Sequence, residues 1–193
     1  HREVRVTMPR ESYQEQLTEL REDVLFMSEL VLERLRVGLD AIERKDEDLA
    51  WEVIDGDDEI NDRYLELEQD CVDLLALQQP VAGDLRFIAA SFKIITDLER
   101  IADLAVNLGD YALDAQRDLY PDVDVQGIGD DVVEMVEDAM DAYDRGDADA
   151  CYGIADRDDA IDEHCARASQ VVVRDLIERE LDAGDTEAEV EAL

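Results

Sequence analysis

The chain has 193 residues, of which 46% are hydrophobic, and its 54 acidic side chains against 18 basic ones give a formal net charge of −36. This charge excludes nucleic acid as a partner, because phosphates require a cationic surface, and the interleaving of acids with apolar residues excludes a disordered acidic chain. We therefore expect a folded protein whose self-repulsion is screened in a salty cytoplasm, such as that of a halophilic archaeon.

The first part of the chain predicts two long helices that pack along a common seam. The first helix covers about residues 10–44, because apolar residues recur there at steps of three and four. The second covers about residues 46–77, with Asp46 as a candidate N-cap and apolar residues at every seventh position. The predicted seam residues are Leu17, Leu20, Val24, Met27, Val31, Val53, Ile60, Leu67 and Leu74.

Three further helices follow in chain order. A turn around Pro80 and Gly83 precedes a third helix over about residues 84–115, for which Asp84 is the expected cap. Residues 121–129, which contain a proline and two glycines, form the predicted linker. Beyond the linker we predict a fourth helix over about residues 130–144 and a fifth over about residues 147–181, with a break at Gly184.

The two halves of the chain repeat each other at a constant offset of 101 residues. Residues 39–48 (LDAIERKDED) match residues 140–149 (MDAYDRGDAD), and residues 57–60 (DDEI) match residues 158–161 (DDAI). Matches at one offset across helix, turn and helix are typical of an internal structural repeat.

The repeat predicts an all-α fold of two tandem three-helix bundles, the first over residues 8–118 and the second over residues 125–193. Asp84, which opens the third helix, corresponds to Asp185, so the second unit lacks most of its third helix in this sequence. We expect an exposed apolar groove at that place, and a homo-oligomer could cover it if another chain supplies the missing helix.

Catalytic constellations are missing from the sequence. His164 is the only internal histidine, and it lacks the glutamate three residues before it that a di-iron bundle requires. No serine has a visible histidine partner, and Gly83 is not followed by the lysine of a phosphate-binding loop. We therefore predict that the protein is not an enzyme and that His164 is a partly exposed helix residue.

Cysteine usage and hydropathy indicate a cytoplasmic protein. Cys71, Cys151 and Cys165 lack the spacing of a disulfide framework, and we expect them to be reduced core residues. No apolar stretch approaches the roughly 18 residues that cross a bilayer, and no signal peptide is visible.

Glu99 and Asp103 are the most informative acidic pair, because they lie in the least acidic stretch of the chain, residues 87–112. A spacing of four residues places both carboxylates on one face of a helix, where they could share a hard cation. Arg100 offers the alternative that the pair is only a surface charge cluster.

Three segments resemble the PhoU family of phosphate-uptake regulators. These are residues 74–86 (LLALQQPVAGDLR), residues 97–103 (DLERIAD) with Asn107 one turn later, and residues 53–57 (VIDGD) with Asn61. The second segment carries the Glu-x-x-x-Asp motif that is most diagnostic of the family. The family's two tandem, spectrin-like three-helix units also agree with the repeat.

The resemblance implies a regulator of phosphate transport. PhoU-like proteins negatively control phosphate uptake and phosphate-responsive signalling by contacting the ATPase of the phosphate ABC transporter and, in bacteria, a membrane-bound sensor kinase. A homodimer is the oligomer we expect. The alternative is a metal-storing or metal-sensing helical bundle without a transporter partner.

The resemblance also implies metal ligands, which are Glu99, Asp103, Asp57, Asn61, Asp158 and Asp162. Family members bind iron, zinc or other cations through such motifs, whereas an all-oxygen ligand set favours magnesium or manganese. Tyr64 and Cys165 stand at positions where the family commonly has an acid, which would reduce the size of any cluster.

Overall fold

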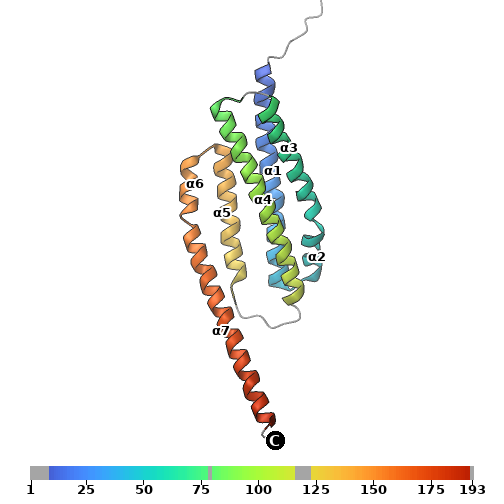
Figure 1. Cartoon of the computed structure of the whole chain (residues 1–193), viewed down its shortest axis with the longest axis vertical. Helices are drawn as coiled ribbons and strands as arrows, with labels where there is room; N and C mark the ends of the chain where they lie inside the picture. Colours follow the sequence, from blue (N-terminus) through green and yellow to red (C-terminus); the bar gives the residue numbers. More distant parts are fainter. Residues whose placement is uncertain (1–8, 78–79, 116–122, 192–193) are drawn as a thin grey trace, which may run out of the picture.

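The computed structural model describes residues 9–77, 80–115 and 123–191, and these residues form seven helices and no strand, which confirms the predicted all-α fold. Figure 1 shows the helices running along one long axis. In chain order they are α1 (Pro9–Arg44), α2 (Glu47–Asp55), α3 (Asp57–Leu77), α4 (Ala82–Ala115), α5 (Val125–Arg145), α6 (Ala148–Ala155) and α7 (Asp158–Glu191).

The first unit is a bundle in which α1, α4 and the α2–α3 pair all pack against one another. The nine seam residues named above are all buried, from Leu17 on α1 to Leu74 on α3, whereas Leu49 and Tyr64 of the complementary seam are half-buried. Residues of α4 complete this core, among them Ile88, Ile95 and Ala102, because their spacing of seven matches the seam opposite.

Two helices predicted as continuous are each broken in the structure. The second predicted helix is α2 and α3, which meet at Gly56, and the fifth is α6 and α7, which meet at residues 156–157. The predicted cap at Asp46 is confirmed, since its Oδ1 accepts hydrogen bonds from the backbone N–H of Asp48 at 2.9 Å and of Leu49 at 3.2 Å.

Three predicted boundaries are wrong. Helix α4 begins at Ala82, so Asp84 lies in its first turn rather than at its cap. Helix α5 begins within the predicted linker, because Asp124 caps it by accepting a hydrogen bond from Gly127 N–H at 2.8 Å. Helix α7 continues through Gly184 to Glu191, since one glycine costs a helix only about 1 kcal/mol. The predicted unit boundaries at residues 8, 118 and 193 lie outside the described residues.

The second unit is attached to the first through α5, which packs against α1. Val133 on α5 joins a buried cluster with Leu35 and Leu39, and a side chain at Gly129 would overlap Leu39. Helices α6 and α7 then pack against α5, and α7 continues past the beginning of α5, away from the bundle (Figure 1). Among the described residues, no helix combines the length and apolar character needed to span a membrane.

Candidate functional site

Asp57 and Asn61 lie one turn apart at the start of α3. The Asn61 Nδ2 donates a hydrogen bond to Asp57 Oδ2 at 2.7 Å, which fixes the orientation of the carboxylate. The other oxygen, Asp57 Oδ1, is buried and accepts no hydrogen bond within the described part of the chain. A buried carboxylate oxygen without a donor costs free energy unless a proton donor or a cation approaches it.

Glu99 on α4 lies within electrostatic reach of Asp57, because α3 and α4 pack against each other. Partial burial raises the pKa of Glu99, and the negative charges of Asp103 and Asp57 raise it further, while Arg100 lowers it. Arg100, the alternative charge partner, also lies with its guanidinium 3.9 Å from the Asp97 carboxylate. The negative charges of Asp103 and Asp57 therefore both disfavour the ionised form of Glu99, which is an effect that a bound cation relieves.

These residues fit a hard cation in their chemistry. The atoms with which they could bind a metal are all oxygens, and Asp57 Oδ1, which accepts no hydrogen bond, is available as a ligand. Within the described residues, however, no three acidic, histidine or cysteine side chains converge at metal-binding distance. Side-chain rotation would therefore be needed to close the site around an ion.

Asp158 and Asp162, the second predicted pair, lie at the start of α7 and are both exposed. They occupy the repeat positions of Asp57 and Asn61, yet no described helix covers them as α4 covers α3. The structure therefore places Glu99 within electrostatic reach of Asp57, whereas Asp158 and Asp162 are exposed.

The remaining candidate residues have ordinary surroundings. Cys71 is buried as predicted, but the prediction that Cys151 and Cys165 are core residues is wrong, because both are exposed. His164 is partly exposed, as predicted, with its Nδ1 3.6 Å from the Asp131 carboxylate. Tyr64, at a position where the family often has an acid, donates a hydrogen bond to Glu68 at 3.4 Å.

An apolar groove of about 900 Å³ lies between α4 and the second unit. Its walls come from α4, α5, α6 and α7, and they include Ile94, Ile101, Val132 and Met135. An exposed apolar groove is therefore present at the second unit, as expected.

At the 101-residue offset of the repeat, groove-lining residues of the second unit correspond to residues that α4 covers in the first unit. Buried first-unit residues Val31, Ala50, Val53 and Ile60 are at most 1% exposed. Their counterparts 101 positions later, Val132, Cys151, Ile154 and Ile161, all line the groove. The side chains of the second unit are therefore suited to a third helix. The exposure of Cys151 has the same cause, since its counterpart Ala50 is buried.

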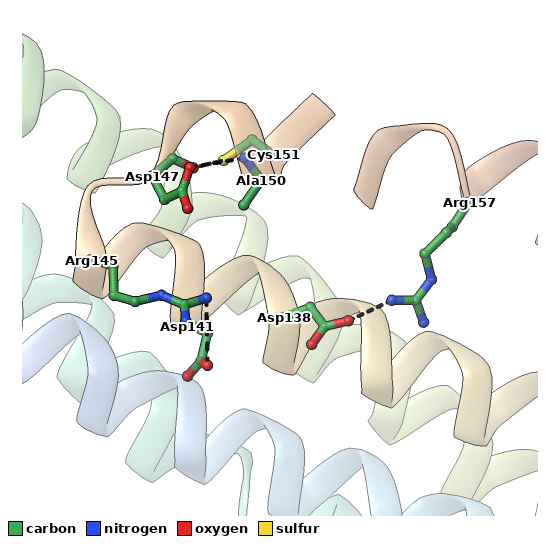
Figure 2. A network of polar contacts seen from close by, with 7 residues as sticks. All are labelled: Asp138, Asp141, Arg145, Asp147, Ala150, Cys151 and Arg157. Atoms are coloured by element: carbon green, nitrogen blue, oxygen red, sulfur yellow. Dashed lines mark hydrogen bonds and ion pairs between the residues drawn. The ribbon is translucent and has the colours of Figure 1, made fainter. Parts of the chain in front are cut away.

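Two arginines at the helix breaks were missed by the sequence analysis. Arg34 on α1 donates hydrogen bonds to the carbonyl oxygens of Glu52 and Gly56, where α2 ends. Figure 2 shows Arg157, at the break between α6 and α7, reaching back to Asp138 on α5. The excess of acids over basic residues was a signal for Arg157 alone, because Arg157 pairs with a carboxylate whereas Arg34 contacts backbone carbonyl oxygens.

Comparison with known proteins identifies relatives along both units. The profile of the PhoU domain family matches residues 24–112 and 125–192. The chain is 36% identical over 150 residues to a phosphate-specific transport system accessory protein PhoU homolog of Aquifex aeolicus, covering 77% of this chain and 68% of that one. It is 32% identical over 150 residues to the accessory protein PhoU of Escherichia coli, covering 77% of this chain and 62% of that one.

Solved structures agree with this assignment. The crystal structure of PhoU from Pseudomonas aeruginosa superimposes with a TM-score of 0.80 at 31% identity, over 92% of this chain and 85% of that one. The phosphate transport system regulatory protein PhoU from Streptococcus pneumoniae gives a TM-score of 0.76 at 29% identity, over 82% and 75%. Fold, repeat, motif and relatives agree, and the chain belongs to the PhoU family.

Proposed function

We propose that this chain is a cytoplasmic regulatory adaptor, not an enzyme, that negatively controls phosphate uptake and phosphate-responsive signalling. The observation that carries the proposal is the family match across both units, with relatives named as accessory proteins of phosphate-specific transport systems. The adaptor would act by binding the phosphate ABC transporter machinery, chiefly its ATPase, and a sensor kinase or other regulator where one is present.

Binding of a helix is the mode of contact that we propose for such an adaptor. The apolar groove beside α4 supports this mode, because an amphipathic helix places its apolar face in a groove of this kind. We also propose that the protein forms a homodimer, which light scattering at native salt concentration would detect as twice the monomer mass.

Deletion of the gene tests the regulatory role. Cells without this protein should take up labelled phosphate faster than wild-type cells when phosphate is plentiful, because the restraint on the transporter is lost. Re-expression of the intact protein should restore the slower uptake. Equal uptake rates in the deletion and wild-type cells would contradict negative control.

We further propose that a metal ion binds across α3 and α4 through Glu99, Asp103 and Asp57, with Asn61 as a supporting residue. The buried, unpartnered Asp57 Oδ1 and the raised pKa of Glu99 support this site. Magnesium or manganese suits the oxygen ligands best, and iron or zinc are the alternatives that the family resemblance adds. Asp158 and Asp162 would contribute to a second site only when another helix supplies partners for them.

The same acidic set supports a second candidate function, a metal-storing or metal-sensing bundle without a transporter partner. Elemental analysis of protein purified without chelator tests the metal site for both functions. We expect bound metal in the wild type and less in Glu99→Gln, with Asp97→Asn as the control on the same helix. Metal-free wild-type protein would contradict the site.

A further inference from the structure

Arg34 connects α1 to the break between α2 and α3, one residue before Asp57. Its Nη1 donates a hydrogen bond to the carbonyl oxygen of Glu52 at 2.8 Å, and its Nη2 donates one to the carbonyl oxygen of Gly56 at 3.1 Å. The last carbonyls of a helix lack partners within it, so one guanidinium satisfies two groups that the end of α2 leaves open.

The bond to Gly56 bears directly on Asp57. The Gly56 carbonyl and the Asp57 N–H belong to one planar peptide unit, so holding the carbonyl also fixes the direction in which α3 begins. Gly56 itself has φ −86° and ψ 2°, a conformation that any residue tolerates. Glycine leaves room for Arg34, because a Cβ at this position would overlap its guanidinium unless that side chain moved.

We propose that Arg34 is a positioning residue for the cation site, an inference that rests on the metal binding proposed above. Arg34 fixes the peptide unit before Asp57, and Asn61 holds Oδ2 of its carboxylate at 2.7 Å. Of the two Asp57 carboxylate oxygens, Oδ2 accepts the Asn61 hydrogen bond and Oδ1 has no hydrogen-bond partner among the described residues. Residues that orient a metal ligand from outside the ligand set usually change metal affinity when they are removed.

The second unit provides a matched control. In the first unit the arginine lies on the first helix and contacts the helix break, whereas in the second unit the arginine lies at the break and contacts the first helix. Arg157 occupies the repeat position of Gly56 and donates a hydrogen bond from the helix break to Asp138 on α5 (Figure 2). Its Nη2 also lies 3.6 Å from the Glu134 carboxylate. Removing Arg157 therefore disconnects a helix break from the first helix of its unit without touching Arg34, Gly56 or Asp57.

The experiment is a calorimetric titration of the metal-free full chain with Mn²⁺ in concentrated KCl. The variants are Arg34→Met, Arg34→Lys, Gly56→Ala and the control Arg157→Met, each checked for folding by circular dichroism and for its melting temperature. We expect Arg34→Met to weaken Mn²⁺ binding by about tenfold and Arg157→Met to leave it within about twofold of the wild type.

The two other variants keep the test decisive if Arg34→Met fails to fold. Arg34→Lys should also weaken Mn²⁺ binding, because one ammonium cannot reproduce the two-pronged geometry of the guanidinium. Gly56→Ala should do the same by displacing the guanidinium. Equal Mn²⁺ affinity in the wild type and these variants, or an equal loss in Arg157→Met, would overturn the positioning role. Failure of the wild type to bind Mn²⁺ would instead overturn the proposed cation site.

Discussion

The hydroxyl oxygens of Ser91 on α4 and Tyr143 on α5 lie 2.8 Å apart and connect the two units. Ser91 is fully buried and also donates to the Phe87 carbonyl oxygen, while the Tyr143 ring stacks on the Phe87 ring with centroids 5.7 Å apart. Arg21 on α1 adds another contact beside it, because its Nη1 donates a hydrogen bond to the Asp144 carbonyl oxygen at 2.6 Å. A small polar cluster beside the groove therefore adds to the apolar packing of α5 on α1 that attaches the second unit.

Removing the Ser91 hydroxyl should destabilise the protein more than removing the Tyr143 hydroxyl. Ser91→Ala leaves the Tyr143 hydroxyl without its partner and should cost about 1–3 kcal/mol, whereas after Tyr143→Phe the serine keeps its bond to Phe87 and the cost should be about 1 kcal/mol. Urea unfolding of both variants measures the difference. The reverse order would contradict this account of the cluster.

Tyr143 should also make stability depend on pH in the alkaline range. Burial raises its pKa to about 12, above the ordinary value of 10.0, with the Ser91 hydrogen bond and Arg21 opposing the shift. The unfolded chain then releases this proton more readily than the folded one, so the free energy of unfolding should fall as pH rises from 10 towards 12. Tyr143→Phe should flatten that decline in pH-dependent melting curves, and an unchanged slope would argue against the assignment.

Glu99→Gln should affect metal-free stability and metal affinity in opposite directions. Burial and the charges of Asp103 and Asp57 raise the pKa of Glu99, so its ionised form is disfavoured in the folded state. Neutralising it should raise the melting temperature of the metal-free protein near pH 7 and weaken Mn²⁺ binding. Asp97→Asn is the control, since Asp97 is exposed on the same helix. A lower melting temperature for Glu99→Gln would show that the carboxylate is stabilising.

Two glycine-to-alanine changes should have opposite effects on stability. A Cβ at Gly109 on α4 would lie 2.9 Å from the Ala50 carbonyl oxygen and 3.1 Å from Ile54 Cγ1, so Gly109→Ala should separate α4 from α2 and cost about 1–3 kcal/mol. At Gly153 on α6 nothing lies within 4 Å of the added Cβ, and alanine should stabilise the helix by up to about 1 kcal/mol. Thermal unfolding measures both.

The cysteines should report on the core and on the groove. Burial raises the pKa of Cys71 to about 11, so this thiol should react with iodoacetamide only after unfolding, whereas Cys151 and Cys165 are exposed and should react in the folded protein. Cys151 lines the groove and Cys165 does not. A helix bound in the groove should therefore protect Cys151 alone, as mass spectrometry of the labelled peptides would detect.

The core of the first unit could be predicted from the sequence because its apolar residues recur at regular intervals. Leucine and isoleucine at every seventh position specify which face of each helix is buried, and Leu67, Ile60 and Ile95 are buried as that rule requires. The pairs at four-residue spacing, Asp57 with Asn61 and Glu99 with Asp103, were also visible. That Glu99 lies within electrostatic reach of Asp57 depends on how α3 and α4 are aligned, which no single helix specifies.

The helix breaks could not be predicted, because their partners lie elsewhere in the chain. Gly56 interrupts a helix that its neighbours would continue, and the groups that satisfy the interruption come from Arg34 on another helix. Cys151 was predicted to be buried on the basis of residue type, and its counterpart Ala50 is buried. The prediction was wrong because Cys151 lines the open groove, and no described helix covers it as α4 covers Ala50.

The central claim, that this PhoU-family chain acts on phosphate transport through direct contact, is tested most directly by affinity purification of the tagged, intact protein from a native high-salt lysate. Mass spectrometry should identify the ATPase of a phosphate ABC transporter among the recovered proteins and not in a purification with the tag alone. Recovery of the protein at native salt concentration without any transporter subunit would contradict the claim.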